Sequence, residues 1–201
     1  MADRISNILT ALFRCTDGTN VVPLLNAKVM VDENGVAVGP YFASIGGVNR
    51  AIPYVLAQSA VAVSVGAVTS EAALATITVP ANAMGPNGTL RITAFWTYTN
   101  GADDKILRIR FSGAAGTIYH TTTATTTASQ TVQVSICNIN ATNSQKSGSP
   151  NSVSFGTSAN QSVTSAVDTT AATTIVITGQ KETGTDTLTL ERYLVEVLYG
   201  A

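Results

Sequence analysis

The chain has a single histidine, His120, and it is the only side chain that could act as an imidazole base. A serine hydrolase would place it beside a serine such as Ser112, with Asp103, Asp104 or Asp168 behind the ring. The chain contains no G-x-S-x-G nucleophile motif. We therefore interpret His120 as an ordinary surface or interface histidine, and we predict no catalytic residue.

Acidic side chains are few, and they fall in segments rich in turn-forming residues. The candidates for acids or ligands are Asp103, Asp104, Asp168, Glu182 and Asp186. A glycosidase needs two facing carboxylates, and no pair here has a recognisable spacing. Calcium loops of the EF-hand type are also absent from the sequence. The sequence thus predicts no enzyme, no cofactor and no metal site.

Two groups of side chains could bind a ligand without catalysis. Arg91, Arg108 and Arg110 occupy polar positions of predicted strands, where they could contact an anion or a glycan. Pairing with Asp or Glu is the preferred interpretation. Trp96 and Tyr98 could form a sugar platform, but they share the alternation phase of the apolar residues before them, which favours the core.

A run of threonines, from Thr121 to Thr127, is polar and low in complexity. We predict a long loop at the tip of the β-domain, and loops on a rigid scaffold often carry binding. The candidate binding residues are Thr121, Thr122, Thr123 and Thr125. The alternative is a solvated connection without a ligand.

Composition limits the classes to which the protein can belong. Charged residues make up 11% of the 201 residues, the net charge is −1 and 45% of the residues are hydrophobic. Such a chain is too apolar for disorder and lacks the basic footprint of a nucleic-acid binder. It holds 30 Thr and 16 Ser, which suit pleated, neutral surfaces. A neutral surface fits a protein held in a larger assembly better than a lone monomer.

Neither the most apolar stretch nor the two cysteines predict a functional site. Residues from Ala51 to Val68 are rich in Ala and Val but interrupted by Pro53 and polar residues, so we predict an extended linker and no membrane insertion. Cys15 and Cys137 lie in different predicted units. We interpret them as buried or free thiols, with a disulfide between them as the open alternative.

The first predicted unit, residues 1–66, is an arm that has no core of its own. From Asp3 to Arg14 the apolar residues recur with helical spacing. They form one face of a predicted helix, and they are Ile5, Ile8, Leu9, Leu12 and Phe13. A short helix is unstable alone, so this face is predicted to need a partner, either in this chain or in another.

The rest of the arm is predicted to hold one small hairpin. Asn34-Gly35 lies between two apolar runs, which is the strongest short signal for a hairpin turn. Pro40, the Gly46-Gly47 pair and Pro53 predict irregular structure after it.

Residues 67–201 are predicted to form an antiparallel β-sandwich or jelly roll of about eight strands. The strands follow from apolar–polar alternation and cover 74–79, 89–98, 105–111, 116–120, 131–136, 152–155, 174–178 and 187–198. The last one changes phase between Leu190 and Tyr193. Either a bulge at Glu191-Arg192 resets the alternation, or both faces are buried. We partly prefer the second, because Leu194 is also apolar.

Several of these segments together resemble small structural proteins of tailed bacteriophages, of the fibre, spike or capsid-decoration type. The resemblance runs from Glu71 to Leu198. It rests on Ala81-Asn-Ala-Met-Gly-Pro-Asn-Gly-Thr-Leu-Arg-Ile92, Trp96-Thr-Tyr-Thr-Asn100, Lys105-Ile-Leu-Arg-Ile-Arg110, Thr174-Ile-Val-Ile-Thr-Gly-Gln180 and Leu190-Glu-Arg-Tyr-Leu-Val-Glu196.

The resemblance implies a virion location and a jelly-roll-like domain that forms homotrimers. It also implies that residues 1–66 attach the protein to other virion proteins, in the capsid, neck or tail. We therefore expect a non-enzymatic structural component whose β-domain projects as a trimeric knob. The alternative is a receptor-binding or lectin-like tail protein that recognises a host surface glycan.

Overall fold

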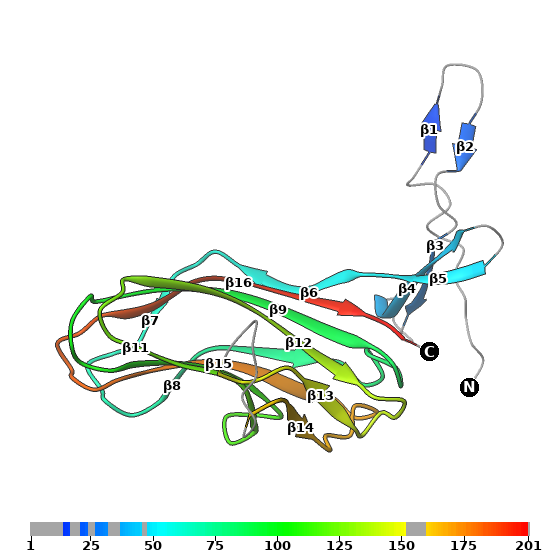
Figure 1. The fold of residues 1–201 in the computed structure, drawn as a ribbon. Helices are drawn as coiled ribbons and strands as arrows, with labels where there is room; N and C mark the ends of the chain where they lie inside the picture. Colours follow the sequence, from blue (N-terminus) through cyan, green and yellow to red (C-terminus); the bar gives the residue numbers. More distant parts are fainter. Residues whose placement is uncertain are drawn as a thin grey trace.

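The computed structural model describes residues 14–16, 21–23, 27–31, 37–45, 48–151 and 160–200, and it describes side chains from residue 53 onward within these ranges. This part of the chain is β-structure without a helix, and its strands pair antiparallel. Eleven strands form two facing sheets (Figure 1). The predicted antiparallel β-class is confirmed, with more strands than the eight expected.

The smaller of the two sheets has four strands in the order β11-β10-β15-β8. Its strands are β8 (Ala72–Val79), β10 (Lys105–Phe111), β11 (Thr117–Ala124) and β15 (Thr173–Lys181). Alternating residues of β10 point to opposite faces of this sheet. Leu107 and Ile109 are buried on the core face, while Arg108 and Arg110 are partly exposed on the outer face. The four strands predicted at 74–79, 105–111, 116–120 and 174–178 are therefore present in this sheet.

The larger sheet has seven strands, in the order β14-β13-β12-β9-β16-β6, and β7 also pairs with β16. Their bounds are β6 (Tyr54–Ser59), β7 (Val63–Ser64), β9 (Thr89–Tyr98), β12 (Ser129–Asn138), β13 (Gln145–Ser147), β14 (Val163–Ser165) and β16 (Leu188–Leu198). Every second residue of β9 from Leu90 to Tyr98 is buried. The predicted strand 152–155 lies outside the described residues.

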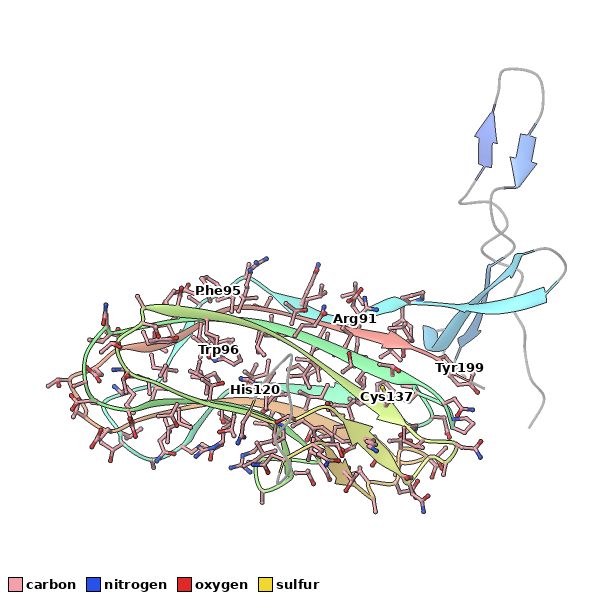
Figure 2. The ribbon with its side chains drawn as sticks, in the orientation of Figure 1. Arg91, Phe95, Trp96, His120, Cys137 and Tyr199 are labelled. Atoms are coloured by element: carbon pink, nitrogen blue, oxygen red, sulfur yellow. The ribbon has the colours of Figure 1, made fainter. Side chains whose placement is uncertain are left out.

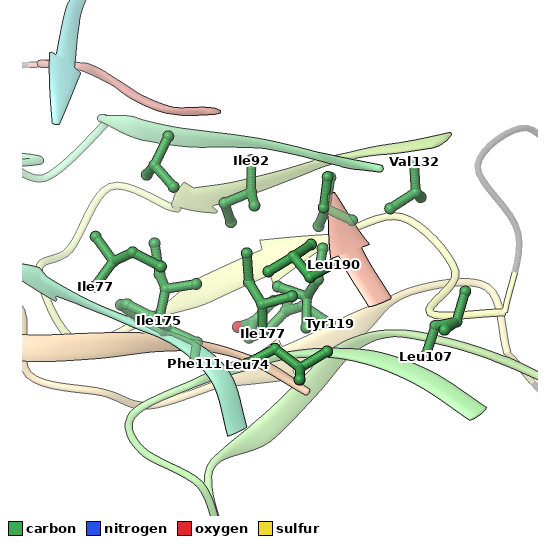
Figure 3. Close-up of a cluster of buried hydrophobic side chains, with 14 of the residues drawn as sticks. Leu74, Ile77, Ile92, Leu107, Phe111, Tyr119, Val132, Ile175, Ile177 and Leu190 are labelled. Carbon is green, nitrogen blue, oxygen red and sulfur yellow. The ribbon is translucent and has the colours of Figure 1, made fainter. Parts of the chain in front are cut away.

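A single apolar core fills the space between the two sheets. Figure 3 shows Ile92 and Leu190 from the larger sheet facing Ile175 and Ile177 from the smaller one, and all four are at most 1% exposed. Fully burying one such side chain stabilises the fold by about 1.5–3 kcal/mol. Trp96 is fully buried in the same core, as its alternation phase predicted.

The phase change in the last strand comes from a bulge. β16 pairs with β9 through Leu190↔Trp96 and then Arg192↔Phe95, so Glu191 is the extra residue. The bulge returns Val195 to the core face, where it is fully buried. The preference for two buried faces was therefore wrong: an unpaired residue resets the alternation at no cost in core contacts.

The front of the chain contains strands where irregular structure was predicted. β3 (Ala27–Val31), β4 (Ala37–Ile45) and β5 (Val48–Ile52) form a small antiparallel sheet. The β3–β4 pairing confirms the two strands of the predicted hairpin. The expectation that Pro40 ends regular structure was wrong, because Pro40 lies within β4.

The predicted helix 3–14 cannot be compared in full. Residues 1–13 lie outside the described part, and Arg14 opens β1 (Arg14–Thr16), which pairs with β2 (Val21–Pro23).

The predicted linker, residues 51–68, contains two strands of the larger sheet. Both β6 and β7 pair with β16, and Leu56 and Ala57 of β6 pack against the core. Apolar residues of this stretch thus complete the sandwich.

Candidate functional site

The predicted tip-loop residues lie mainly in a strand. Thr121, Thr122 and Thr123 belong to β11, and Thr125 follows its end. The backbone N–H of Thr121 donates a hydrogen bond to the carbonyl of Pro150 (2.8 Å), so this point of the sheet edge is occupied. The expectation of a loop was wrong, because threonine is β-branched and its repeats continue a strand as readily as they form a loop.

His120 is buried and not a surface residue, which corrects the sequence interpretation. It is 2% exposed and shares one hydrogen bond of 3.0 Å with Thr122 Oγ1. A bulge in the β10–β11 pairing makes Tyr119 the extra residue, and both Tyr119 and His120 become buried. Burial lowers the pKa of His120 to about 4 because the charged imidazolium loses its hydration.

Arg108 and Arg110 are paired with one carboxylate, as preferred from the sequence. Glu71 lies just before β8 and accepts from Arg110 Nε (2.8 Å) and Nη2 (2.8 Å) and from Arg108 Nη1 (2.9 Å). The hydroxyl of Thr178 on β15 donates to the same carboxylate (2.6 Å). The hydrogen bond from Arg110, together with both positive charges, lowers the pKa of Glu71 to about 2. The pair of arginines is therefore no vacant anion site.

The outer face of the larger sheet carries two further arginines, Arg91 and Arg192. Arg91 pairs with Glu196 at 3.4 Å, while the guanidinium of Arg192 lies 5.9 Å from the ring centre of Phe95. Among the described side chains no carboxylate pairs with Arg192. Figure 2 shows Phe95 and Arg91 on the outside of this sheet and Trp96 between the sheets. Trp96 therefore offers no sugar platform.

A shallow hollow lies on this outer face, over β6, β9 and β16. Its volume is about 470 Å³. Its lining residues are Gln58, Ser59, Ala60, Thr93, Phe95, Arg192, Tyr193 and Leu194. The hollow combines an aromatic ring, a guanidinium group and neutral polar groups. Sequence reasoning missed it, because Phe95 was recognised only as one alternating residue of a strand.

Two buried lysines at one end of the sandwich were also missed. Lys105 is fully buried, lies 3.5 Å from Asp186 and donates to the carbonyls of Gly101 and Asp103. Lys181, its cross-strand neighbour, donates to the carbonyl of Asp186 (2.7 Å). These bonds join the loops at the ends of β10 and β15. Asp186 is therefore part of a structural ion pair with Lys105.

The other candidates have local structural roles. Asp168 accepts from the N–H and hydroxyl of Thr170, and Glu182 accepts from the N–H of Asp104. Cys137 is a free thiol on β12. No cluster of three potential metal ligands occurs within the described residues. In the same part of the chain no helix is long and apolar enough to cross a membrane.

The predicted contact residues of the arm, Ile5, Ile8, Leu9, Leu12 and Phe13, lie outside the described residues. Their role remains a prediction.

Comparisons with known proteins return structural likenesses only. No known sequence family and no curated protein matches the chain. The structure of infectious bursal disease virus, Gx strain, is similar over 90% of this chain and 43% of its own, with 11% identity and a TM-score of 0.38. The VP2 subviral particle of the same virus is similar over 87% and 42%, with 12% identity and a TM-score of 0.37. The chain spans less than half the length of these proteins, and at such scores the likeness assigns no family and no function.

Proposed function

We propose that the protein is a non-enzymatic structural component of a tailed-bacteriophage virion. In this proposal the arm predicted over residues 1–66, without the strands β6 and β7 that belong to the sandwich, holds the protein to the capsid, neck or tail, through Ile5, Ile8, Leu9, Leu12 and Phe13. The sandwich projects from that anchor as one third of a trimeric knob.

The observation that carries the proposal is the neutral surface of a self-contained sandwich. Charged groups are few, and several are taken up within the chain: Glu71 by two arginines, Glu196 by Arg91, and Asp186 by Lys105. The residues that remain exposed in the described part are chiefly Thr, Ser and Ala, with a few large apolar side chains. Such a surface repels its own copies weakly, and it therefore suits dense packing in an assembly. The sequence resemblance to phage structural proteins supports the same assignment.

The experiment that tests the proposal follows particle assembly. Leu9→Asp would place a charge on the apolar face predicted for the arm, and we expect particles produced with this variant to lack the protein. Asn7→Asp is the matched control, since it adds the same charge on the opposite face of the predicted helix. If both variants are incorporated as the unmodified chain is, the proposed anchor is wrong. A map of intact particles without this chain would overturn the virion role itself.

A second candidate function, recognition of a host surface glycan, is supported by the hollow that contains Phe95 and Arg192. An aromatic ring can stack on a sugar, and a guanidinium group can hold a carboxylate in a forked pair. Binding to acidic saccharides on a glycan array should then be lost in Phe95→Ala. It should persist in Thr123→Ala, which alters the threonine run predicted as a binding site. Binding that is lost only in Thr123→Ala would place the site at β11.

A further inference from the structure

Three Asn-Gly pairs occur in the sequence, and such a pair favours a chemical modification that needs no enzyme. The pairs are Asn34-Gly35, Asn87-Gly88 and Asn100-Gly101. Glycine is the favourable neighbour because it has no Cβ to block the approach of its own nitrogen to the asparagine side chain. The first pair lies outside the described residues, so the structure compares the other two.

The modification is deamidation of the asparagine, one of the thermolabile side chains of proteins. The glycine nitrogen gives up its proton to water and attacks the side-chain carbonyl carbon. A C–N bond forms there, and the amide nitrogen takes up protons and leaves as ammonia. Water then opens the five-membered imide at either carbonyl. One opening gives aspartate, and the other gives isoaspartate, whose main chain is longer by a methylene. Water is the only co-reactant, and nothing is oxidised or reduced.

The pair Asn87-Gly88 is held by its neighbours. Although Asn87 is exposed, its side-chain oxygen accepts a hydrogen bond from the backbone N–H of Asn140 (3.2 Å). Its own N–H donates to the carbonyl of Gly200 (3.1 Å). Gly88 is buried, and a Cβ there would lie 1.7 Å from the carbonyl oxygen of Met84. Ring closure would break the hydrogen bond to Asn140 and move packed backbone, so this loop must open before it reacts.

The pair Asn100-Gly101 lies in the loop between β9 and β10 and is open. Asn100 is exposed, and within the described residues its side chain makes no hydrogen bond. A Cβ on Gly101 would meet only a methyl carbon of Thr99, at 3.9 Å, so there is room for the ring. The glycine nitrogens do not separate the two pairs, because both donate long hydrogen bonds, of 3.3 Å here and 3.5 Å in the other pair.

The same loop holds the buried Lys105. Its ammonium group donates to the carbonyl of Gly101 (3.2 Å), and the residue is fully buried. A buried charge is tolerated only while such partners surround it. An extra methylene in the main chain at residue 100 would shift the carbonyl of Gly101 away from the ammonium group. A change to aspartate would leave the length of the main chain unchanged, so isoaspartate is the product that should loosen this end of the sandwich.

We propose that Asn100 is a site of spontaneous deamidation, and that its conversion to isoaspartate loosens the loop that holds Lys105. The conversion adds one negative charge to a chain whose net charge is −1. Because ammonia is lost, the modified fraction rises with the age of the protein. The inference goes beyond the virion role and does not depend on it.

The first test follows the folded protein at mildly alkaline pH, which promotes loss of the glycine proton. Peptide mapping detects a mass increase of about 1 Da at each converted asparagine, and labelling by isoaspartyl methyltransferase detects isoaspartate. We expect Asn100 to react at least about tenfold faster than Asn87, which must open locally first. The protein in urea is the matched control, because both pairs should then react at similar rates. Equal rates in the folded protein overturn the inference.

The second test separates the longer main chain from the added charge. Thermal unfolding of the incubated protein is compared with that of Asn100→Asp, which carries the charge without the methylene. We expect the incubated protein to melt at a lower temperature, in proportion to its isoaspartate content, and Asn100→Asp to melt as the unmodified chain does. Asn100→Gln, which closes a larger ring far more slowly, should keep its melting temperature during the incubation. If the incubated protein melts as Asn100→Asp does, the proposed loosening is wrong.

Discussion

At the scale of single residues, His120 shows how burial decides chemistry. Its ring lies inside the sandwich with Thr122 as its described hydrogen-bond partner, and its pKa is lowered to about 4. In the unfolded chain the same group titrates near 6.5. Between these two values the unfolded state binds a proton that the folded state does not, so acidification favours unfolding.

We therefore predict that the free energy of unfolding falls by about 3 kcal/mol as the pH is lowered from above 6.5 to about 4. The loss from this group is complete below pH 4. Urea unfolding at several pH values measures it. His120→Gln removes the titrating group and should flatten the dependence over this window. Equal slopes for the two proteins would contradict the buried, neutral histidine.

Glu71 has the same sign at a lower pH, because its pKa is also lowered, from 4.5 to about 2. Its ion pairs with Arg108 and Arg110 stabilise the fold fully above pH 4.5, and this stabilisation is lost as the pH falls towards 2. The carboxylate is 24% exposed, so solvent weakens the pairs.

We predict that Glu71→Gln lowers the free energy of unfolding by about 1–2 kcal/mol at pH 7. The difference from the unmodified protein should shrink between pH 4.5 and 2. Glu196→Gln is the control, because Glu196 has one longer contact of 3.4 Å with Arg91, and its effect should be below about 0.5 kcal/mol. A difference that stays constant down to pH 2 would exclude the titration of Glu71 as its cause.

At the scale of elements, the bulge at Glu191 keeps β16 in register with the core. Leu188 and Leu190 precede it and Val195 and Val197 follow it, and all four are at most 1% exposed. If Glu191 were absent, Leu190 and Arg192 would be consecutive and would alternate correctly, because Arg192 already pairs opposite the outward Phe95.

We predict that deletion of Glu191 leaves the protein folded, at a cost of about 1–2 kcal/mol for adjusting the local twist. Deletion of Leu194 is the matched control. It turns Val195 and Val197 to the outer face, because a one-residue shift exchanges the faces of a strand. That variant should be insoluble or unfolded by circular dichroism. Similar stability in both deletions would mean that β16 is not held in this register.

At the scale of the whole molecule, the border between arm and sandwich is set by strand pairing. Residues 1–66 were predicted as one unit, yet β6 and β7 pair with β16 and Val65 is buried in the core. The backbone N–H of Val65 also donates to the carbonyl of Leu188 (2.8 Å). A stable fragment should therefore include these strands.

We predict that a fragment beginning at Pro53 unfolds within a few degrees of the full chain. A fragment beginning at Ala67 loses β6 and β7, and its melting temperature should drop by about 10 °C, because about 3 kcal/mol of apolar burial is lost. Differential scanning calorimetry of the two fragments measures this. Equal melting temperatures would place the border at residue 66.

The sequence by itself determined the class of fold and much of its core. Alternation in β9, β10, β12 and β16 marks the buried residues, because a strand places neighbouring side chains on opposite faces wherever it lies. The same alternation placed Trp96 in the core. The preference for pairing arginines on polar strand faces with acidic side chains anticipated the contacts of Arg108 and Arg110 with Glu71.

Only the tertiary structure decided which residues a strand pairing or a bulge would bury. Lys105 and His120 are buried because distant loops and a bulge enclose them. The valine-rich stretch looked like a linker because its strands are short and pair with a segment more than a hundred residues away. Which distant segments pair depends on the completed sheet, and this pairing cannot be predicted from the residue pattern of one segment alone.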